Sequence, residues 1–226
     1  GGGSGIDGHW GRPTVADIMM KEVSTKGFVL EEKVNQLKLV ENAEEVRVIE
    51  GNWKQQAWNY MDKFHIPFIH RAPGGLVDLM EYRDYRTELY PHAALQWSWA
   101  KHSEQGFDPD WLPDRFKDPE DKGRRVIALW WFVFPNLTLN FYPWGLSINR
   151  YDPVPGSPDR CRFHWYHYVL DEEKYALRES VYLNRKTDQE DVEAMALAKR
   201  GLQSGFAERG AFAPGEEDGP HWFHRL

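Results

Sequence analysis

The sequence contains a single cysteine, Cys161, among its 226 residues. One cysteine cannot form an internal disulfide, a four-cysteine zinc site or an iron–sulfur cluster, so we expect a reducing, cytoplasmic location. Long apolar runs are also lacking. The longest extends from Val126 to Phe134, far below the roughly 18 residues that a membrane span needs. No signal-peptide pattern opens the chain, and we expect no membrane partner.

Positive charge is scarce as well. Lys and Arg number 28 against 35 Asp and Glu, for a net charge of −7. Binding to nucleic acid needs clustered positive charge, so we exclude a nucleic-acid partner. Aromatic residues, in contrast, are abundant, with 11 Trp, 12 Phe and 10 Tyr. A chain of this composition can bury a substantial core.

The order of sequence patterns predicts one domain. Residues 1–5 are typical of a flexible linker or an expression-vector remnant, and we assign residues 6–226 to a single domain. Strand-like segments cover 36–50, 82–100 and most of 126–170, with Pro- and Gly-rich turns between them. The polar stretch 101–125 interrupts them and is a candidate lid. A helix is expected from Trp53 to Phe64, ending or kinking near Pro67.

A last large helix is expected from about Asp188 to Gly205. Thr187 and Glu190 have the spacing of a capping box, with Thr187 as the N-cap residue. Asp191, Met195, Ala198, Leu202 and Phe206 recur on one face of this helix. Strands followed by a long C-terminal helix predict an α+β domain, in which a curved antiparallel sheet grips helices.

The most informative motif is Asp-x₂-His-x₄-His, formed by Asp62, His65 and His70. On a straight helix Asp62 and His65 are neighbours, whereas His65 and His70 stand about 140° apart. A kink at Pro67 would bring His70 back toward His65. Asp191 is the best third ligand, because an unpaired carboxylate on an apolar helix face is costly.

Two imidazoles and one carboxylate form the facial triad of non-haem Fe(II) oxygenases, which leaves positions open for O₂ and substrate. Two other interpretations remain at this point. The histidines can be structural or exposed, and an acid early in a helix can simply complement the helix dipole.

Three segments resemble Rieske-type ring-hydroxylating oxygenases, in the catalytic domain of the large (alpha) subunit. The first is Asn52-Trp53-Lys54 with Asn59, Asp62, His65 and His70. The second runs from Asn136 to Asn149, and the third is Glu190-Asp191 with the apolar helix that follows. The resemblance covers Asn52 to Leu226.

The resemblance implies a helix-grip (START/Bet v 1-like) fold with mononuclear Fe(II) on His65, His70 and Asp191. Asp62 would match the family's bridging carboxylate, which accepts a hydrogen bond from a histidine ligand and carries electrons from the Rieske cluster of a neighbouring subunit. Asn59 would match a residue near the iron. The family also implies homo-trimers.

One departure from the family is clear. A Rieske [2Fe–2S] cluster needs two Cys and two His, and this chain has one Cys. We therefore expect the cluster, and a reductase fed by NAD(P)H, to be supplied from outside this sequence.

The favoured function is O₂-dependent hydroxylation of an organic, apolar or aromatic substrate. Aromatic residues crowd the central strands, and they suit an aromatic substrate by stacking or a quaternary ammonium by cation–π contact. The sequence does not show which of them face inward, and it identifies no substrate-binding residue. The alternatives are a hydrophobic-ligand-binding module without turnover and a zinc-dependent hydrolase.

Overall fold

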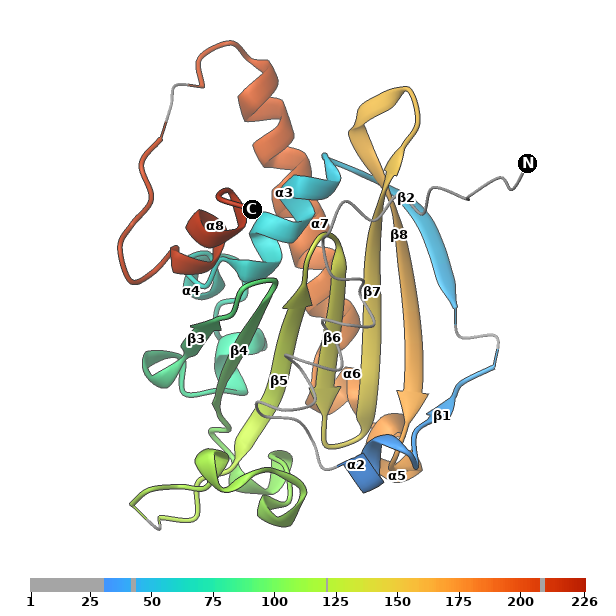
Figure 1. The fold of residues 1–226 in the computed structure, drawn as a ribbon, viewed down its shortest axis with the longest axis vertical. Helices are drawn as coiled ribbons and strands as arrows, with labels where there is room; N and C mark the ends of the chain where they lie inside the picture. The colour runs from blue at the N-terminus through green and yellow to red at the C-terminus, as the bar shows by residue number, and fades with distance from the viewer. Residues whose placement is uncertain (1–30, 42–43, 121, 208–209) are drawn as a thin grey trace, which may run out of the picture.

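The computed structural model describes residues 31–41, 44–120, 122–207 and 210–226. The expected linker at residues 1–5 lies outside the described residues. Within them the strands form one antiparallel sheet, and helices cover one of its faces (Figure 1). The predicted α+β class is therefore confirmed.

The sheet is an antiparallel meander with the strand order β1-β8-β7-β6-β5-β4-β3, and β2 also pairs with β8. Its strands are β1 (Lys38–Leu39), β2 (Glu45–Glu50), β3 (Arg86–Leu89), β4 (Ala93–Trp99), β5 (Val126–Val133), β6 (Leu137–Tyr142), β7 (Gly145–Val154) and β8 (Ser157–Val169). The long β7–β8 hairpin carries β2 at its outer side, in register from Glu45 opposite Trp165 to Glu50 opposite Arg160.

The two faces of the sheet differ in chemistry because side chains alternate along each strand. On β5 and β6, Trp130, Asn140 and Tyr142 point to the helix-covered face and line a cavity. Their neighbours Trp131 and Phe141 belong to the buried cluster on the opposite face. The structure thus shows which of the crowded aromatic residues face inward.

The described residues of the stretch 101–125 cover the face of the sheet that lies away from the cavity. It contains three short 3₁₀ turns, Ser103–Gln105, Pro109–Trp111 and Asp114–Phe116. Phe107, Leu112 and Phe116 are buried against Trp97 and Trp131. The lid interpretation is wrong, because these apolar residues anchor the segment in the core.

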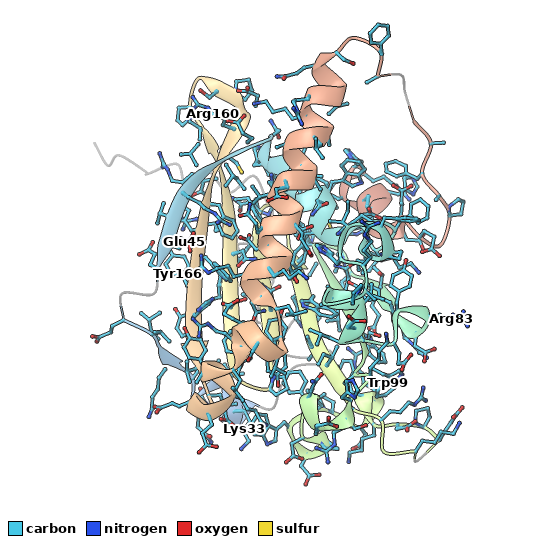
Figure 2. All side chains as sticks on the ribbon, turned by 180° about the vertical axis from the view of Figure 1, so that it is seen from behind. Lys33, Glu45, Arg83, Trp99, Arg160 and Tyr166 are labelled. Carbon is cyan, nitrogen blue, oxygen red and sulfur yellow. The ribbon has the colours of Figure 1, made fainter. Side chains whose placement is uncertain are left out.

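The main helices are α3 (Trp53–Met61), α7 (Asn184–Gln203) and α8 (Asp218–Phe223). Seen from behind, α7 runs along the face of the sheet (Figure 2). Gly219 allows α8 to approach α3 closely, because a Cβ there would lie 2.6 Å from the Met61 carbonyl oxygen. The short helices are α2 (Glu31–Val34), α4 (Ile66–Ile69), α5 (Glu172–Ala176) and α6 (Arg178–Val181). In the part of the chain described here, no helix is long and apolar enough to cross a membrane.

Helix α7 begins earlier than its sequence predicts. Its first residue is Asn184, after Leu183 in the left-handed conformation (φ 54°). The Thr187 N–H donates to the Leu183 carbonyl inside the first turn, so Thr187 is no N-cap and the predicted capping box is wrong. The predicted apolar face also ends early, because Leu202 and Phe206 are 58% and 90% exposed.

Candidate metal centre

The metal-ligand candidates of the first segment lie around a break between α3 and α4. Asn52 caps α3, accepting from the Lys54 N–H, and Gln55 Oε1 accepts from the Asn52 N–H. The helix ends at Met61, and Asp62 is extended. The break therefore comes before Pro67, which lies in the first turn of α4. A proline is tolerated there because that N–H has no helical partner.

His65 and His70 flank the single turn of α4. Their Nε2 atoms lie 3.2 Å apart, and their rings are nearly perpendicular, at 75°. The helix break removes the 140° separation that a straight helix would impose. His70 is 1% exposed.

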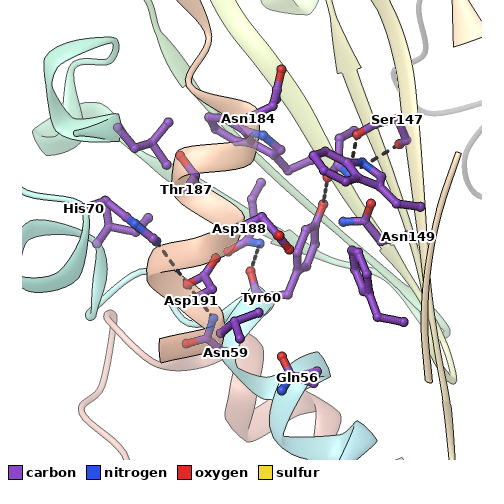
Figure 3. A pocket seen from close by; sticks show the side chains of 18 of the residues that line it. Gln56, Asn59, Tyr60, His70, Ser147, Asn149, Asn184, Thr187, Asp188 and Asp191 are labelled. Atoms are coloured by element: carbon purple, nitrogen blue, oxygen red, sulfur yellow. Dashed lines mark hydrogen bonds and ion pairs between the residues drawn. The ribbon is translucent and has the colours of Figure 1, made fainter. Parts of the chain in front are cut away.

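Asp191 comes to the same point from α7. Its Oδ1 lies 3.1 Å from His70 Nε2 and 3.4 Å from His65 Nε2. Asn59 Nδ2 donates to that oxygen at 2.7 Å, and Figure 3 shows Asn59 and His70 converging on Asp191. Ligand atoms of His65, His70 and Asp191 all lie within 4.8 Å of one another, which makes this group a possible site for a metal ion.

Asp62 contacts the other nitrogen of His65. Its Oδ2 lies 3.2 Å from His65 Nδ1, and the two side chains are 12% and 16% exposed. The same carboxylate accepts hydrogen bonds from the backbone N–H groups of Phe64 and His65. Asp62 thus holds both the turn after α3 and the orientation of the ring.

Two acidic residues near the centre were missed in the sequence. Glu190 Oε2 lies 2.8 Å from His70 Nδ1, where the capping-box interpretation had assigned it to the helix end. Asp188, where the sequence predicted the start of the helix, lines the cavity and pairs with Arg47. Burial raises the pKa of Asp188, and Arg47 opposes that shift. The available signal for Asp188 was its spacing of three from Asp191, which places both on one side of a helix, whereas the spacing carried no such signal for Glu190.

The charges of the chain favour a cation at this point. Burial lowers the pKa of His65, but hydrogen bonds to Asp191 and Asp62 outweigh it and raise the pKa to about 9. Burial raises the pKa of Asp191, yet its hydrogen bonds with His65 and His70 bring it below its usual range. A divalent cation would replace the proton between these groups, and two imidazole nitrogens with one carboxylate suit Fe(II) or zinc.

A cavity of about 120 Å³ adjoins this cluster. Its aromatic lining includes Tyr60, Tyr85, Trp130, Tyr142, Tyr151, Phe163, Trp165 and Tyr182, and its amide lining includes Gln56, Asn59, Gln96, Asn140, Asn149 and Asn184. Tyr60 donates its hydroxyl to Asn140 Oδ1 at 2.6 Å, and Asn140 Nδ2 donates to Ser147 Oγ at 3.0 Å. These bonds connect residues of the cavity wall, among them Tyr60 and Ser147, which Figure 3 labels.

Apart from His65, whose pKa is raised, the charged residues of the cavity wall are acidic. Asp188 and Asp191 contribute carboxylates, and no Lys or Arg is found among the described residues that line it. Aromatic faces and carboxylates both attract cations. The cavity therefore suits a small cationic or neutral molecule better than an anion.

Comparison with known proteins agrees with this geometry. The family described as "Ring hydroxylating alpha subunit (catalytic domain)" matches residues 34–226. Choline monooxygenase from Arabidopsis thaliana is 28% identical over 185 residues, covering 79% of this chain and 39% of that protein. The enzyme from Amaranthus tricolor is 25% identical, over 78% of this chain and 37% of its own length.

Solved structures show the same fold. A quaternary ammonium Rieske monooxygenase superposes with a TM-score of 0.64 at 21% identity, covering 84% of this chain and 49% of that one. Dicamba monooxygenase bound to dicamba gives 0.52 at 13% identity, with coverage of 84% and 57%. All four relatives are described as monooxygenases, one of them as a Rieske monooxygenase, and the chain spans under two-fifths of the length of the curated ones. The chain belongs to the family of ring-hydroxylating alpha-subunit catalytic domains.

Proposed function

We propose that the chain is the catalytic domain of a non-haem iron oxygenase, with Fe(II) held by His65, His70 and Asp191. The observation that carries this proposal is the convergence of two imidazole Nε2 atoms and one carboxylate oxygen beside a cavity with an aromatic lining. Bound iron would activate O₂ for insertion into a substrate C–H bond, a chemistry typical of this ligand set. We infer that residues 6–226 form one domain, of helix-grip type, because α7 lies along one face of the antiparallel sheet.

The residues around the ligands would orient them and exclude water. Asp62 fixes the ring of His65 through Nδ1, and Asn59 holds the Asp191 oxygen through its amide. Because His70 is almost fully buried, bulk water has no access to it. Asp62 would also be the point at which electrons enter, since it contacts a ligand and remains partly exposed.

The electrons would come from a Rieske [2Fe–2S] centre outside this sequence, reduced through an NAD(P)H-dependent reductase. A single cysteine cannot hold such a centre. The related quaternary ammonium monooxygenase is described with inter-subunit electron transfer. We propose that electrons pass between subunits in this protein as well, within a homo-trimer. We also propose a cytoplasmic location.

For the substrate we propose a small quaternary ammonium compound, hydroxylated by monooxygenation. The support is the combination of aromatic faces, two carboxylates and a lining without Lys or Arg in the described part of the cavity wall. Desolvated cation–π contacts contribute about 2 kcal/mol. The choline monooxygenases among the relatives point to the same class. An uncharged aromatic substrate, which the sequence favoured, is the second candidate because the same rings can stack on it.

The test has two parts. Anaerobic reconstitution with Fe(II) should give one iron per chain in the wild type and none in His65→Ala. Choline should then bind roughly 30-fold more tightly than its neutral isostere 3,3-dimethyl-1-butanol, the ratio that corresponds to about 2 kcal/mol. Equal binding of the two probes would reject the cationic substrate and leave the aromatic one. Absence of iron would reject the oxygenase.

A further inference from the structure

His70 is the more deeply buried of the two histidines, and both of its ring nitrogens have acidic partners. Nε2 lies 3.1 Å from Asp191 Oδ1, and Nδ1 lies 2.8 Å from Glu190 Oε2. With 1% exposure the ring has no access to bulk water. A buried Nδ1–H without an acceptor would be costly, and Glu190 removes that cost.

The two acids are consecutive on α7, but they contact opposite sides of one ring. Helix α7 therefore holds His70 at two points, since Asp191 lies at the nitrogen that faces the cluster and Glu190 at the nitrogen that faces away from it. A rotation or shift of this helix would disturb both contacts together. The second oxygen of Glu190, Oε1, lies 3.7 Å from Lys186 Nζ one turn earlier, which anchors the carboxylate from the solvent side.

We propose that Glu190 is a positioning residue for His70. It accepts the Nδ1–H hydrogen bond, which selects the tautomer whose Nε2 lone pair points at the cation site and holds the ring plane in place. Such outer partners orient metal-bound histidines and raise their basicity, and their loss typically weakens metal binding 10- to 100-fold. The role in metal binding rests on the proposed iron site.

Glu190 and Asp62 are equivalent in this arrangement although they come from different parts of the chain. Asp62 serves Nδ1 of His65 from three residues away, and Glu190 serves Nδ1 of His70 from 120 residues away. With both in place, the two Nε2 atoms are directed to a common point. If either carboxylate were removed, the Nε2 atom of its histidine would no longer be held toward that point.

The experiment compares Glu190→Ala and Glu190→Gln with the control Glu193→Gln on the same helix. Glu193 is exposed and accepts a hydrogen bond from Gln189. The first readout is the histidine tautomer in the metal-free protein, from two-dimensional ¹⁵N NMR of imidazole nitrogens. The second is the dissociation constant for Co²⁺, from competition with a chelator.

In the wild type we expect His70 to carry its proton on Nδ1. Glu190→Ala should mix the tautomers and weaken Co²⁺ binding 10- to 100-fold. Glu190→Gln, which retains an acceptor oxygen, should lie between the alanine variant and the wild type, and Glu193→Gln should match the wild type.

Unchanged tautomer and Co²⁺ affinity in Glu190→Ala would overturn the inference while leaving the iron site intact. A tautomer change in a protein that binds no Co²⁺ would support the Glu190–His70 pair but reject the proposed metal function. The two failures are therefore distinguishable.

Discussion

Histidines with buried or partly buried rings occur in two places on the helix-covered side of the described sheet, and their surroundings are opposite. His65 and His70 lie among three carboxylates, those of Asp62, Glu190 and Asp191. His167 on β8 lies among the rings of Trp144, Trp165 and Tyr175. Its Nδ1 contacts the Tyr175 hydroxyl at 2.9 Å, and it has no carboxylate partner in the described structure.

The two surroundings shift the imidazole pKa in opposite directions. The carboxylates outweigh burial and raise the pKa of His65 to about 9. Burial lowers the pKa of His167 to about 4, and the positive charges of Arg178 and Arg185 add to that effect. Burial without a carboxylate partner thus keeps His167 neutral, whereas convergent carboxylates make a buried site suited to a cation.

The largest expected effect comes from removing the carboxylate that joins the two ligand histidines. Asp191→Ala should weaken divalent-metal binding about 10³-fold, because losing one partner of a buried charged group costs about 4 kcal/mol. Calorimetric titration with Co²⁺ would measure this. Asp188→Asn, on the same helix, should stay close to the wild type. A similar loss in both variants would mean that general negative charge, not ligation, determines affinity.

The aromatic surroundings of His167 predict acid sensitivity. Its folded-state pKa, about 4, lies below the ordinary value of 6.5. The unfolded chain therefore binds a proton between these values while the folded chain does not, and stability decreases as pH falls from 6.5 to 4. The loss amounts to about 3 kcal/mol. Urea unfolding at pH 7.5 and pH 4.5 should show a smaller difference in His167→Phe, and the full difference in the exposed-site control His102→Phe.

A smaller effect is expected at Asp62. This residue contacts Nδ1 of His65 and not the Nε2 atom that faces the cation site. Asp62→Asn should weaken metal binding about tenfold, since an outer partner of a ligand histidine is lost. It should also lower the pKa of His65 in the metal-free protein, which NMR titration would measure. An unchanged His65 pKa would show that Asp191 alone produces the shift.

The smallest effect is expected at His164, an intermediate case. Its Nε2 lies 3.2 Å from Asp152 Oδ2 and its Nδ1 lies 3.7 Å from Glu44 Oε1, so carboxylates are near but do not converge with a second histidine. His164→Gln should leave the metal stoichiometry and the Co²⁺ affinity unchanged. A lower stoichiometry would show that one carboxylate beside a histidine is enough for binding.

The part of this site that is formed by residues close together in the sequence could be predicted. Asp62 and His65 are three residues apart, and helix geometry predicted their contact, although in the structure the contact forms in the turn after α3. The position of the break was not predicted correctly, because Pro67 suggested a kink, whereas the extended Asp62 already ends α3. The α+β class was predictable from alternation along the strands and from their turns.

The site residues that α7 contributes, far along the chain from the two histidines, were predictable only in part. Asp191 was selected because a carboxylate on an apolar face needs a partner, but Glu190 was missed because the wrong helix start assigned it to a capping box. Leu183, in the left-handed conformation that begins α7, carries no sequence signal for such a start. The inward set of aromatic residues depends on strand register, which alternation in a doubly buried strand does not reveal.

The most direct test is an anomalous difference map at the iron absorption edge, from crystals grown after Fe(II) reconstitution. We predict one peak per chain, bonded to the Nε2 atoms of His65 and His70 and to the Asp191 carboxylate. A peak elsewhere, or none at this point in iron-loaded protein, would contradict the account.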